Sequence, residues 1–445
     1  MTFRNLKEPR IVTGIPGPKI KKVLELTGPI FPKYSQPIVD EAEGIFIKDP
    51  DENIFIDFIS SRCVMNIGHN HPKLVQALQQ QVSKSVFGLT EKVLYMIMKL
   101  NQITPGNYQK TVLCGQTGSS MNDLAIKYSR GATGRSNIIS FAGSYHGVTY
   151  GALSMSSFSK AMFKGFGPML PGIYQMPYAN CYRCIFGSKD SDCDLNCLRY
   201  MTDIAFKSYL DPEEVAGIVF EPIQGDAGWY VPPNEWFSML KEICRDNNIL
   251  MIAEEIQSGF GRTGKWFAVE HWNLIPDILL LGKSLGGGIP SAAAVIRGNL
   301  DLPEGGGRNA SLLNTVSYNP LSTVSSIANI EIIEQENLVQ NSSKMGDYAK
   351  RRLQEMMKNH PSIGDVRGQG LMIGLDIVED KTSKKPDLKC AEKIVDEAFR
   401  RGLYIMHMGS FGTAVIRLAP PLIINKEQMD SSLNILEDSI AEAES

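Results

Sequence analysis

The sequence has no long hydrophobic run, no excess of charge of one sign and only six histidines among its 445 residues. No apolar stretch approaches the roughly 20 residues that a transmembrane helix needs, and the first ten residues lack the apolar core of a secretion signal. The formal net charge of -3 provides no electrostatic basis for binding nucleic acid. We therefore expect a cytoplasmic enzyme with neither membrane nor nucleic-acid partners.

The composition, 43% hydrophobic and 21% charged, is typical of a soluble globular protein, and the length suggests two domains. Up to residue 320, apolar runs of strand length alternate with helical patterns, which indicates an α/β fold with a mainly parallel sheet. We predict an N-terminal arm and hairpin over residues 1–60, a large domain over 61–320 and a smaller α/β domain over 321–445. More locally, we predict an extended arm over 1–40, a hairpin over 44–57 and a strand over 370–377.

Four of the eight cysteines are scattered, and the other four form a C-x2-C-x8-C-x3-C cluster at Cys181, Cys184, Cys193 and Cys197. Four thiolates can close a tetrahedral zinc site, but an iron–sulfur site, two disulfides or a metal-free loop fit the same residues. The spacing matches no standard zinc finger, so a metal-free loop or disulfides are favoured here. His69 and His71 stand two residues apart without a third nearby ligand, and we interpret them as parts of a structural turn.

One lysine follows a buried strand directly. The apolar run Ile278–Leu281 precedes Lys283, which begins a glycine-rich turn. Poor solvation disfavours the cationic form of a lysine, and a neutral amine can form a Schiff base with an aldehyde. The three glycines that follow permit close approach to a flat ligand. A solvated surface lysine beside a turn is the simpler alternative.

Two other strand ends carry residues suited to a phosphate and to a flat ring. After a predicted strand at 111–115, the Gly118-Ser119 turn opens a helix, whose free N–H groups and positive dipole end suit a phosphate. After a strand at 137–141, Tyr145 lies on a tight turn where ligands of open α/β sheets bind, and its ring could stack on a ligand. An ordinary N-cap and a core aromatic are the corresponding structural alternatives.

A further strand end carries an acid. The predicted strand at 248–253 ends in Glu254, and a carboxylate there is poorly placed unless it meets a cation, such as a pyridinium nitrogen. Ile256 falls on the same strand face and could pack beneath a ring. The phosphate turn, the aromatic turn, the acid and the lysine together fit pyridoxal phosphate (PLP), which needs all four.

With these residues in this order, the chain resembles the class III (4-aminobutyrate-type) aminotransferases, PLP enzymes of fold type I, including their branch of α-amino-acid racemases. The resemblance covers nearly the whole length. It is carried by GHNHP (68–72), TGS (117–119), SYHG (144–147), EPIQG (221–225), EEIQSGFGRTG (254–264), LGKSLGGGIP (281–290), NP (319–320), VRGQGL (366–371) and IRLAPP (416–421). It implies a large domain built on a mainly parallel sheet of seven strands.

The resemblance also implies roles for single residues. Gly118 and Ser119 would hold the phosphate, together with Thr315 of the partner subunit. Tyr145 would stack on the ring, Ile256 would pack beneath it, and His146 would also belong to the cofactor site. Gln257 would reach the phenolic oxygen and Glu254 the ring nitrogen. Lys283 would bind the aldehyde, and Arg417 the substrate α-carboxylate. The family shares its active sites across subunits, so a homodimer or a dimer of dimers is implied.

Three residues depart from the common family pattern. Glu254 stands where the ring-nitrogen acid is normally aspartate. Val148 stands where the 4-aminobutyrate and ornithine enzymes carry an arginine for the distal carboxylate. Asp226 replaces a glutamate that normally covers the substrate-binding arginine. The last two departures also occur in the racemase branch.

Two functions follow from the resemblance. The first is transfer of an amino group between an amine or amino acid and a 2-oxo acid, which most of the family performs. The second is racemisation of an α-amino acid. Both begin when Lys283 removes the Cα proton, but racemisation needs a second acid on the opposite face, and Asp226 is the candidate. A scaffold without chemistry is disfavoured because Lys283, Gln257 and Arg417 are all present.

Overall fold

The computed structural model describes residues 3, 6–27, 36–107, 109–188, 193–298, 300 and 312–445. The chain forms two compact units. Unit 1 contains Met1–Val75, Gly261–Gly264 and Ile332–Ser445, and unit 2 contains Gln76–Phe260 and Lys265–Glu331. The divisions between the units fall after residues 75, 260, 264 and 331, whereas the sequence analysis placed domain boundaries after residues 60 and 320. Of the described helices, α3 (Pro72–Val82) and α11 (Pro320–Gln335) each include one of these divisions.

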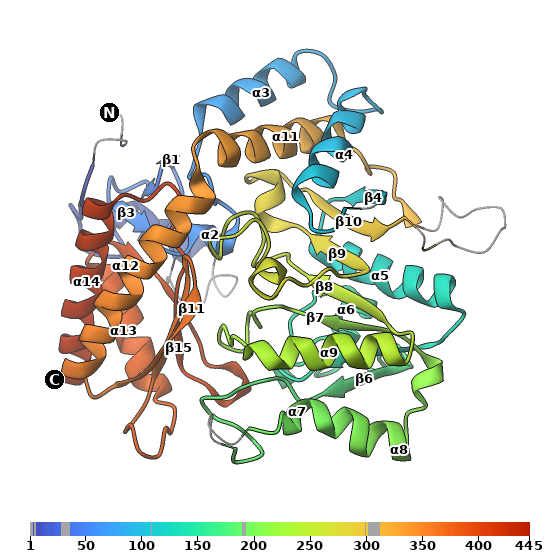
Figure 1. Cartoon of the computed structure of the whole chain (residues 1–445). Coiled ribbons are helices and arrows are strands. Elements are labelled where there is room, and N and C mark those ends of the chain that lie inside the picture. Colours follow the sequence, from blue (N-terminus) through green and yellow to red (C-terminus); the bar gives the residue numbers. More distant parts are fainter. Residues whose placement is uncertain are drawn as a thin grey trace. The chain divides into compact units, whose positions relative to one another are not determined.

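Unit 2 is built on one seven-stranded sheet with the order β4-β10-β9-β8-β7-β5-β6 (Figure 1). The strands are β4 (Lys110–Gly115), β5 (Asn137–Phe141), β6 (Ile173–Met176), β7 (Val215–Phe220), β8 (Leu250–Glu254), β9 (Ile278–Leu281) and β10 (Ala292–Arg297). Neighbours from β9 to β6 are parallel, and only β10 runs against the others. The predicted α/β fold with a mainly parallel sheet is confirmed.

The helices of unit 2 bury the sheet. They are α4 (Lys92–Ile103), α5 (Gly118–Thr133), α6 (Tyr150–Met155), α7 (Asn196–Arg199), α8 (Phe206–Ser208) and α9 (Asn234–Asp246). Helix α5 packs on β7, β9 and β10, and its buried Leu124 and Tyr128 share a core with Ile252 and Leu280. Because β7, β8 and β9 are buried along their whole length, their sequences are continuous apolar runs rather than alternating ones.

Unit 1 contains two four-stranded sheets, ordered β1-β2-β3-β13 and β11-β12-β15-β14. Their strands are β1 (Glu41–Glu43), β2 (Phe46–Lys48), β3 (Ile54–Asp57), β11 (Ile363–Gln369), β12 (Met372–Ile377), β13 (Leu403–Tyr404), β14 (Met406–Met408) and β15 (Val415–Leu418). The helices of this unit are α1 (Pro18–Thr27), α2 (Ser60–Cys63), α12 (Leu338–Asn359), α13 (Leu388–Arg400) and α14 (Lys426–Glu444).

The structure of unit 1 confirms one local prediction, the hairpin at 44–57, and changes another, the strand at 370–377. The hairpin predicted at 44–57 is the antiparallel pair β2–β3. The strand predicted at 370–377 is instead the second arm of the β11–β12 hairpin, because Gly370 adopts a φ of +53° and turns the chain.

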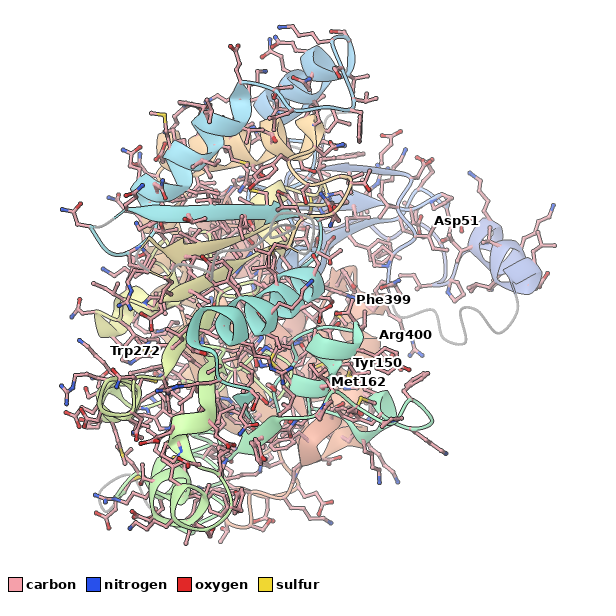
Figure 2. All side chains as sticks on the ribbon, turned by 90° about the vertical axis from the view of Figure 1, so that its right-hand side faces the viewer. Asp51, Tyr150, Met162, Trp272, Phe399 and Arg400 are labelled. Atoms are coloured by element: carbon pink, nitrogen blue, oxygen red, sulfur yellow. The ribbon has the colours of Figure 1, made fainter. Side chains whose placement is uncertain are left out.

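The arm predicted as extended contains helix α1. Pro18 is its first residue, where a missing N–H costs nothing. The carboxylate of Asp51, labelled in Figure 2, accepts hydrogen bonds from the backbone N–H groups of Lys19 (2.8 Å) and Ile20 (2.9 Å). This cap comes from a residue distant in sequence, so no pattern within the arm indicated it. The predicted arm prolines Pro29 and Pro32 lie outside the described residues.

A buried guanidinium joins the three chain segments of unit 1. Arg262 is fully buried and donates hydrogen bonds to the carbonyl oxygens of Leu371 (3.0 Å) and Pro420 (2.6 Å). It also donates to Ser60 Oγ (2.9 Å) and Asn66 Oδ1 (2.6 Å). Ser60 and Asn66 belong to the N-terminal segment of the unit, and Leu371 and Pro420 belong to its C-terminal segment. Arg262, which lies in the middle segment, therefore connects both through hydrogen bonds in the dry interior.

Arg262→Met should strongly destabilise unit 1. The substitution keeps an unbranched apolar side chain but leaves four buried acceptors without their donor, which should lower the free energy of unfolding by about 3–5 kcal/mol. Chemical denaturation followed by circular dichroism measures this loss. Arg245→Met, which removes an exposed guanidinium paired with Asp246, is the control and should change stability by less than about 0.5 kcal/mol. Equal effects of the two substitutions would contradict the assignment.

Candidate active site

The carboxyl ends of parallel strands in unit 2 meet around one cavity. The strands β4, β5, β7, β8 and β9 run in the same direction, so the residues that follow them lie at one edge of the sheet. The cavity has a volume of about 170 Å³. It is lined by Gly118, Ser119, Tyr145, His146, Gly147, Glu221, Asp226, Glu254, Ile256, Gln257 and Lys283.

Most residues singled out from the sequence lie in this cavity. Three do not line it. Val148 is exposed beside it, and its backbone N–H donates to Ser119 Oγ at 3.1 Å. Thr315 is exposed in the described chain. Arg417 lies on β15 in unit 1 and is only 5% exposed.

The glycine–serine turn approaches its neighbours too closely for any side chain. Thr117 caps helix α5, where its Oγ1 accepts from the backbone N–H of Ser120 at 3.2 Å. A Cβ on Gly118 would lie 2.7 Å from a methyl group of Ile256, and one on Gly147 would lie 2.2 Å from Ser119 Oγ. The turn is therefore a tight cradle at a helix N-terminus, with a shape suited to an anion.

Glu254 is held by His146, which the sequence analysis placed in the cofactor site without predicting its contact with Glu254. His146 Nδ1 lies 2.7 Å from Glu254 Oε2, and Asn122 Nδ2 donates to the same oxygen at 3.3 Å. Both Glu254 and His146 are buried. Because both bonds go to Oε2, the other carboxylate oxygen remains for a donor in the cavity. This suits the nitrogen of a protonated pyridine ring.

Gln257 is oriented by a tryptophan. Trp229 Nε1 donates to Gln257 Oε1 at 2.9 Å. This bond fixes the carbonyl end of the amide toward Trp229, so the amide N–H groups are the atoms that Gln257 can offer to a ligand. Trp229 itself adopts a φ of +55°, in the left-handed region.

Lys283 also lies in the left-handed region, with a φ of +41°. Such a conformation costs a non-glycine residue about 1–3 kcal/mol and persists only where surrounding contacts impose it. Lys283 is the first residue of the 3-10 turn Lys283–Gly286, in which Leu285 N donates to Gly282 O at 2.9 Å. Strained backbone at a candidate nucleophile is consistent with a functional position.

Glu221 is a site residue to which the sequence analysis gave no role. Its Oε1 accepts from Gly225 N at 3.0 Å, and its Oε2 from Tyr145 N at 3.4 Å. Burial, followed by the nearby Glu254 and Asp226 carboxylates, raises the pKa of Glu221 well above its usual value. The cavity therefore holds three clustered acids, Glu221, Asp226 and Glu254, and the burial and charges there disfavour the ionised form of Glu221. The signal for it was its position directly after β7.

The cysteine cluster is reduced in this structure. Cys181, Cys184, Cys193 and Cys197 form no disulfide and line one small hollow. Burial raises the pKa of Cys197 to about 11. Within the described residues, no group of three or more His, Cys, Asp or Glu side chains is arranged to hold a metal ion.

The two histidines of the GHNHP motif make structural contacts in unit 1. His69 Nε2 lies 2.8 Å from Asp57 Oδ2, and His71 Nε2 lies 3.0 Å from Glu336 Oε1. Both contacts fit the predicted turn.

Among the helices that the structure describes, none combines the length and the hydropathy needed to cross a bilayer.

Residues 31–440 match the protein family described as aminotransferase class-III. The chain belongs to this family. It is 38% identical to an alanine/serine racemase of Pyrococcus horikoshii, over 98% of this chain and 93% of that protein. It is also 38% identical to a leucine/methionine racemase of Thermococcus litoralis, over 95% of this chain and 96% of that protein.

Solved structures of transaminases share the fold. One is an amine transaminase from an uncultivated Pseudomonas species in its PLP-bound form, with 27% identity and a TM-score of 0.84. The match covers 94% of this chain and 96% of that one. The family is PLP-dependent, and the residues present here fit the group. The glycine cradle at α5 suits the phosphate, Glu254 suits the ring nitrogen, and Lys283 suits the aldehyde.

A buried acid next to the site gives a pH-dependent prediction. Glu255 is fully buried, and its carboxylate accepts from Ser258 Oγ and from Val269 N (2.8 Å). Burial raises the pKa of Glu255 to about 7. The folded chain therefore binds this proton more tightly than the unfolded chain, and the free energy of unfolding should fall as pH rises from about 4.5 to about 7.

Glu255→Gln should remove this loss, because glutamine has no proton to release. Relative to the wild type, the variant should gain up to about 3 kcal/mol of stability between pH 4.5 and 7, with no further gain above. Urea denaturation across this range measures the difference, with the exposed Glu242→Gln as control. A difference that stays constant with pH would contradict the assignment.

Proposed function

We propose that this protein is a PLP-dependent α-amino-acid racemase or epimerase. The observation that carries the proposal is Asp226, a carboxylic acid that lines the same cavity as Lys283. The two racemase relatives, similar over nearly the full length, support it. The aminotransferase, which the sequence analysis put first, is therefore the second candidate.

The residues that would hold the cofactor are those of the cavity in unit 2. Gly118, Ser119 and the N-terminus of α5 would bind the phosphate, and Tyr145 and Ile256 would face the two sides of the ring. Glu254, held by His146, would keep the ring nitrogen protonated. The amide N–H groups of Gln257 would donate to the phenolic oxygen. When bound, PLP withdraws electrons from an attached amino acid and acidifies its Cα–H bond.

Racemisation needs two proton carriers on opposite faces of Cα. We assign one face to the Lys283 amine and the other to the Asp226 carboxyl group. The Glu254 and Asp226 carboxylates both lie close enough to Glu221 for their charges to act on it, as the raised pKa of Glu221 indicates.

The substrate and partners follow from the same proposal. The substrate is an α-amino acid, and Arg417 binds its α-carboxylate as a planar fork. The assembly is a homodimer or a dimer of dimers, in which Thr315 of the partner subunit completes the phosphate site. Exposed apolar side chains around α4 support a covered surface there, among them Phe87, Leu89, Leu94 and Met98, which are 60–78% exposed.

Amino-group transfer to a 2-oxo acid is the second candidate. It is favoured by the family description and by the PLP-bound amine transaminase of the same fold. It uses Lys283 in the same way but needs no second acid at Cα. Asp226 then only shapes the entrance of the cavity, and this difference makes Asp226 the residue to test.

Asp226→Asn should impair racemisation by about 100-fold or more, the usual contribution of a general acid or base. It should reduce the half-reaction of transamination with the same amino acid by less than about 10-fold, because Lys283 remains. Chiral chromatography measures the first rate, and the change in cofactor absorbance after mixing with the amino acid measures the second.

Two variants make the comparison specific. Lys283→Ala should abolish both reactions, and the exposed Asp203→Asn should alter neither. Equal loss of both reactions in Asp226→Asn, or no loss, would remove Asp226 as the second acid and favour the aminotransferase.

A further inference from the structure

The orientation of one cavity side chain, Gln257, is set by a residue that does not line the cavity. Trp229 is fully buried, and its indole Nε1 donates to Gln257 Oε1 at 2.9 Å. An indole nitrogen donates a hydrogen bond and never accepts one, so only the carbonyl end of the amide fits beside it. The indole therefore selects one of the two orientations of the Gln257 amide group.

The main chain of Gly225 lies against the same carbonyl oxygen. A Cβ on Gly225 would lie 2.7 Å from Gln257 Oε1 and 2.9 Å from Glu221 Oε1. No side chain larger than that of glycine fits there without moving one of these two groups. Gln257 Oε1 is therefore held by a hydrogen bond from Trp229 and by the close approach of the Gly225 backbone.

Trp229 and Gly225 belong to one closed loop of unit 2, which also carries Asp226. The loop is closed by an isolated antiparallel bridge, in which Gln224 N donates to Tyr230 O at 3.0 Å. Within it, Trp229 N donates to Gly225 O at 3.2 Å. The bond from the indole thus connects the loop of Asp226 to the side chain of Gln257.

We propose that Trp229 is a positioning residue for the bound cofactor, because it holds the Gln257 amide with its N–H groups toward the phenolic oxygen of PLP. This inference rests on the cofactor site of the proposed function, and Trp229 acts only through Gln257. Without the indole, the amide would be free to turn its carbonyl oxygen toward the phenolic oxygen, and two acceptors would then meet.

This orientation has a spectroscopic consequence. Hydrogen-bond donors on the phenolic oxygen share its negative charge. They therefore lower the pKa of the nearby proton on the nitrogen that joins Lys283 to PLP. Other titratable groups also face the cavity, but they are the same in all the variants compared below: Tyr145, His146, Glu221, Asp226 and Glu254.

Trp229→Phe keeps a buried aromatic ring and removes the N–H donor. In the PLP-loaded variant, the apparent pKa of the visible cofactor absorbance should rise by about 0.5–1 pH unit above that of the wild type, because a hydrogen bond to the phenolic oxygen is weakened. Absorbance spectra recorded across a pH titration measure this change. The dissociation constant for PLP should rise about 2- to 10-fold.

A double-mutant cycle separates this role from a general effect on packing. Gln257→Met removes the amide and should raise the absorbance pKa at least as much as Trp229→Phe does. In the Gln257→Met background, Trp229→Phe should cause no further rise, since the amide on which the indole acts is absent. A rise of the same size in both backgrounds would overturn the proposal, as would an unchanged pKa in the single variant Trp229→Phe.

Trp272→Phe is the matched control. Trp272, labelled in Figure 2, packs on Phe237 with ring centroids 4.3 Å apart and does not line the cavity. This substitution should change neither the absorbance pKa nor the affinity for PLP. A rise equal to that in Trp229→Phe would show a general effect of losing a tryptophan and would overturn the specific role.

Failure of the proposed racemase is distinguishable from failure of this inference, because the absorbance titration requires no amino acid. The hydrogen bond itself is testable in cofactor-free protein labelled with ¹⁵N. The indole N–H resonance of Trp229, identified by its absence from Trp229→Phe, should move upfield in Gln257→Met. A resonance that stays in place would overturn the contact on which the role of Trp229 depends.

Discussion

The site depends on one constraint, the parallel alignment of β5, β7, β8 and β9. Because their carboxyl ends lie at one edge, an aromatic turn, two glutamates and a lysine that are far apart in sequence surround one cavity. The four strands are buried along their whole length, and most of their residues are apolar. The polar side chains at their ends are held by backbone that cannot move independently of the core.

Electrostatic interactions among the residues at these strand ends determine which chemistry they can perform. Three acids face one cavity, and burial together with the nearby Glu254 and Asp226 carboxylates raises the pKa of Glu221 well above its usual value. Glu254 meets a histidine and an asparagine on one oxygen only. The longer side chain that departs from the usual aspartate is thereby fixed in place. The fixed amide of Gln257 and the strained backbone of Lys283 complete a preorganised set, which is the condition for stabilising a developing charge.

Much of this could be predicted from the sequence, for identifiable reasons. Strand β9 and the Lys283 turn were predictable because a short continuous apolar run followed by glycines is typical of a buried strand that ends in a turn. Helix α1 was not, because its cap, Asp51, lies more than 30 residues away. His146 was placed near the ring, but its bond to Glu254 joins residues 108 apart and has no local signal. The left-handed turn at Ser60–Cys63 contains no glycine, so no residue type in the sequence predicted it.

The central claim is that the protein inverts the configuration at Cα of an amino acid without needing a 2-oxo acid as amino-group acceptor. The most direct measurement incubates the PLP-loaded protein with single enantiopure amino acids, glutamate and leucine among them, in D₂O and without any 2-oxo acid. Chiral chromatography with mass spectrometry should show the opposite enantiomer carrying one deuterium at Cα, with no net loss of amino acid. If chirality is retained for every amino acid until a 2-oxo acid is added, and amino-group transfer then begins, the account is contradicted.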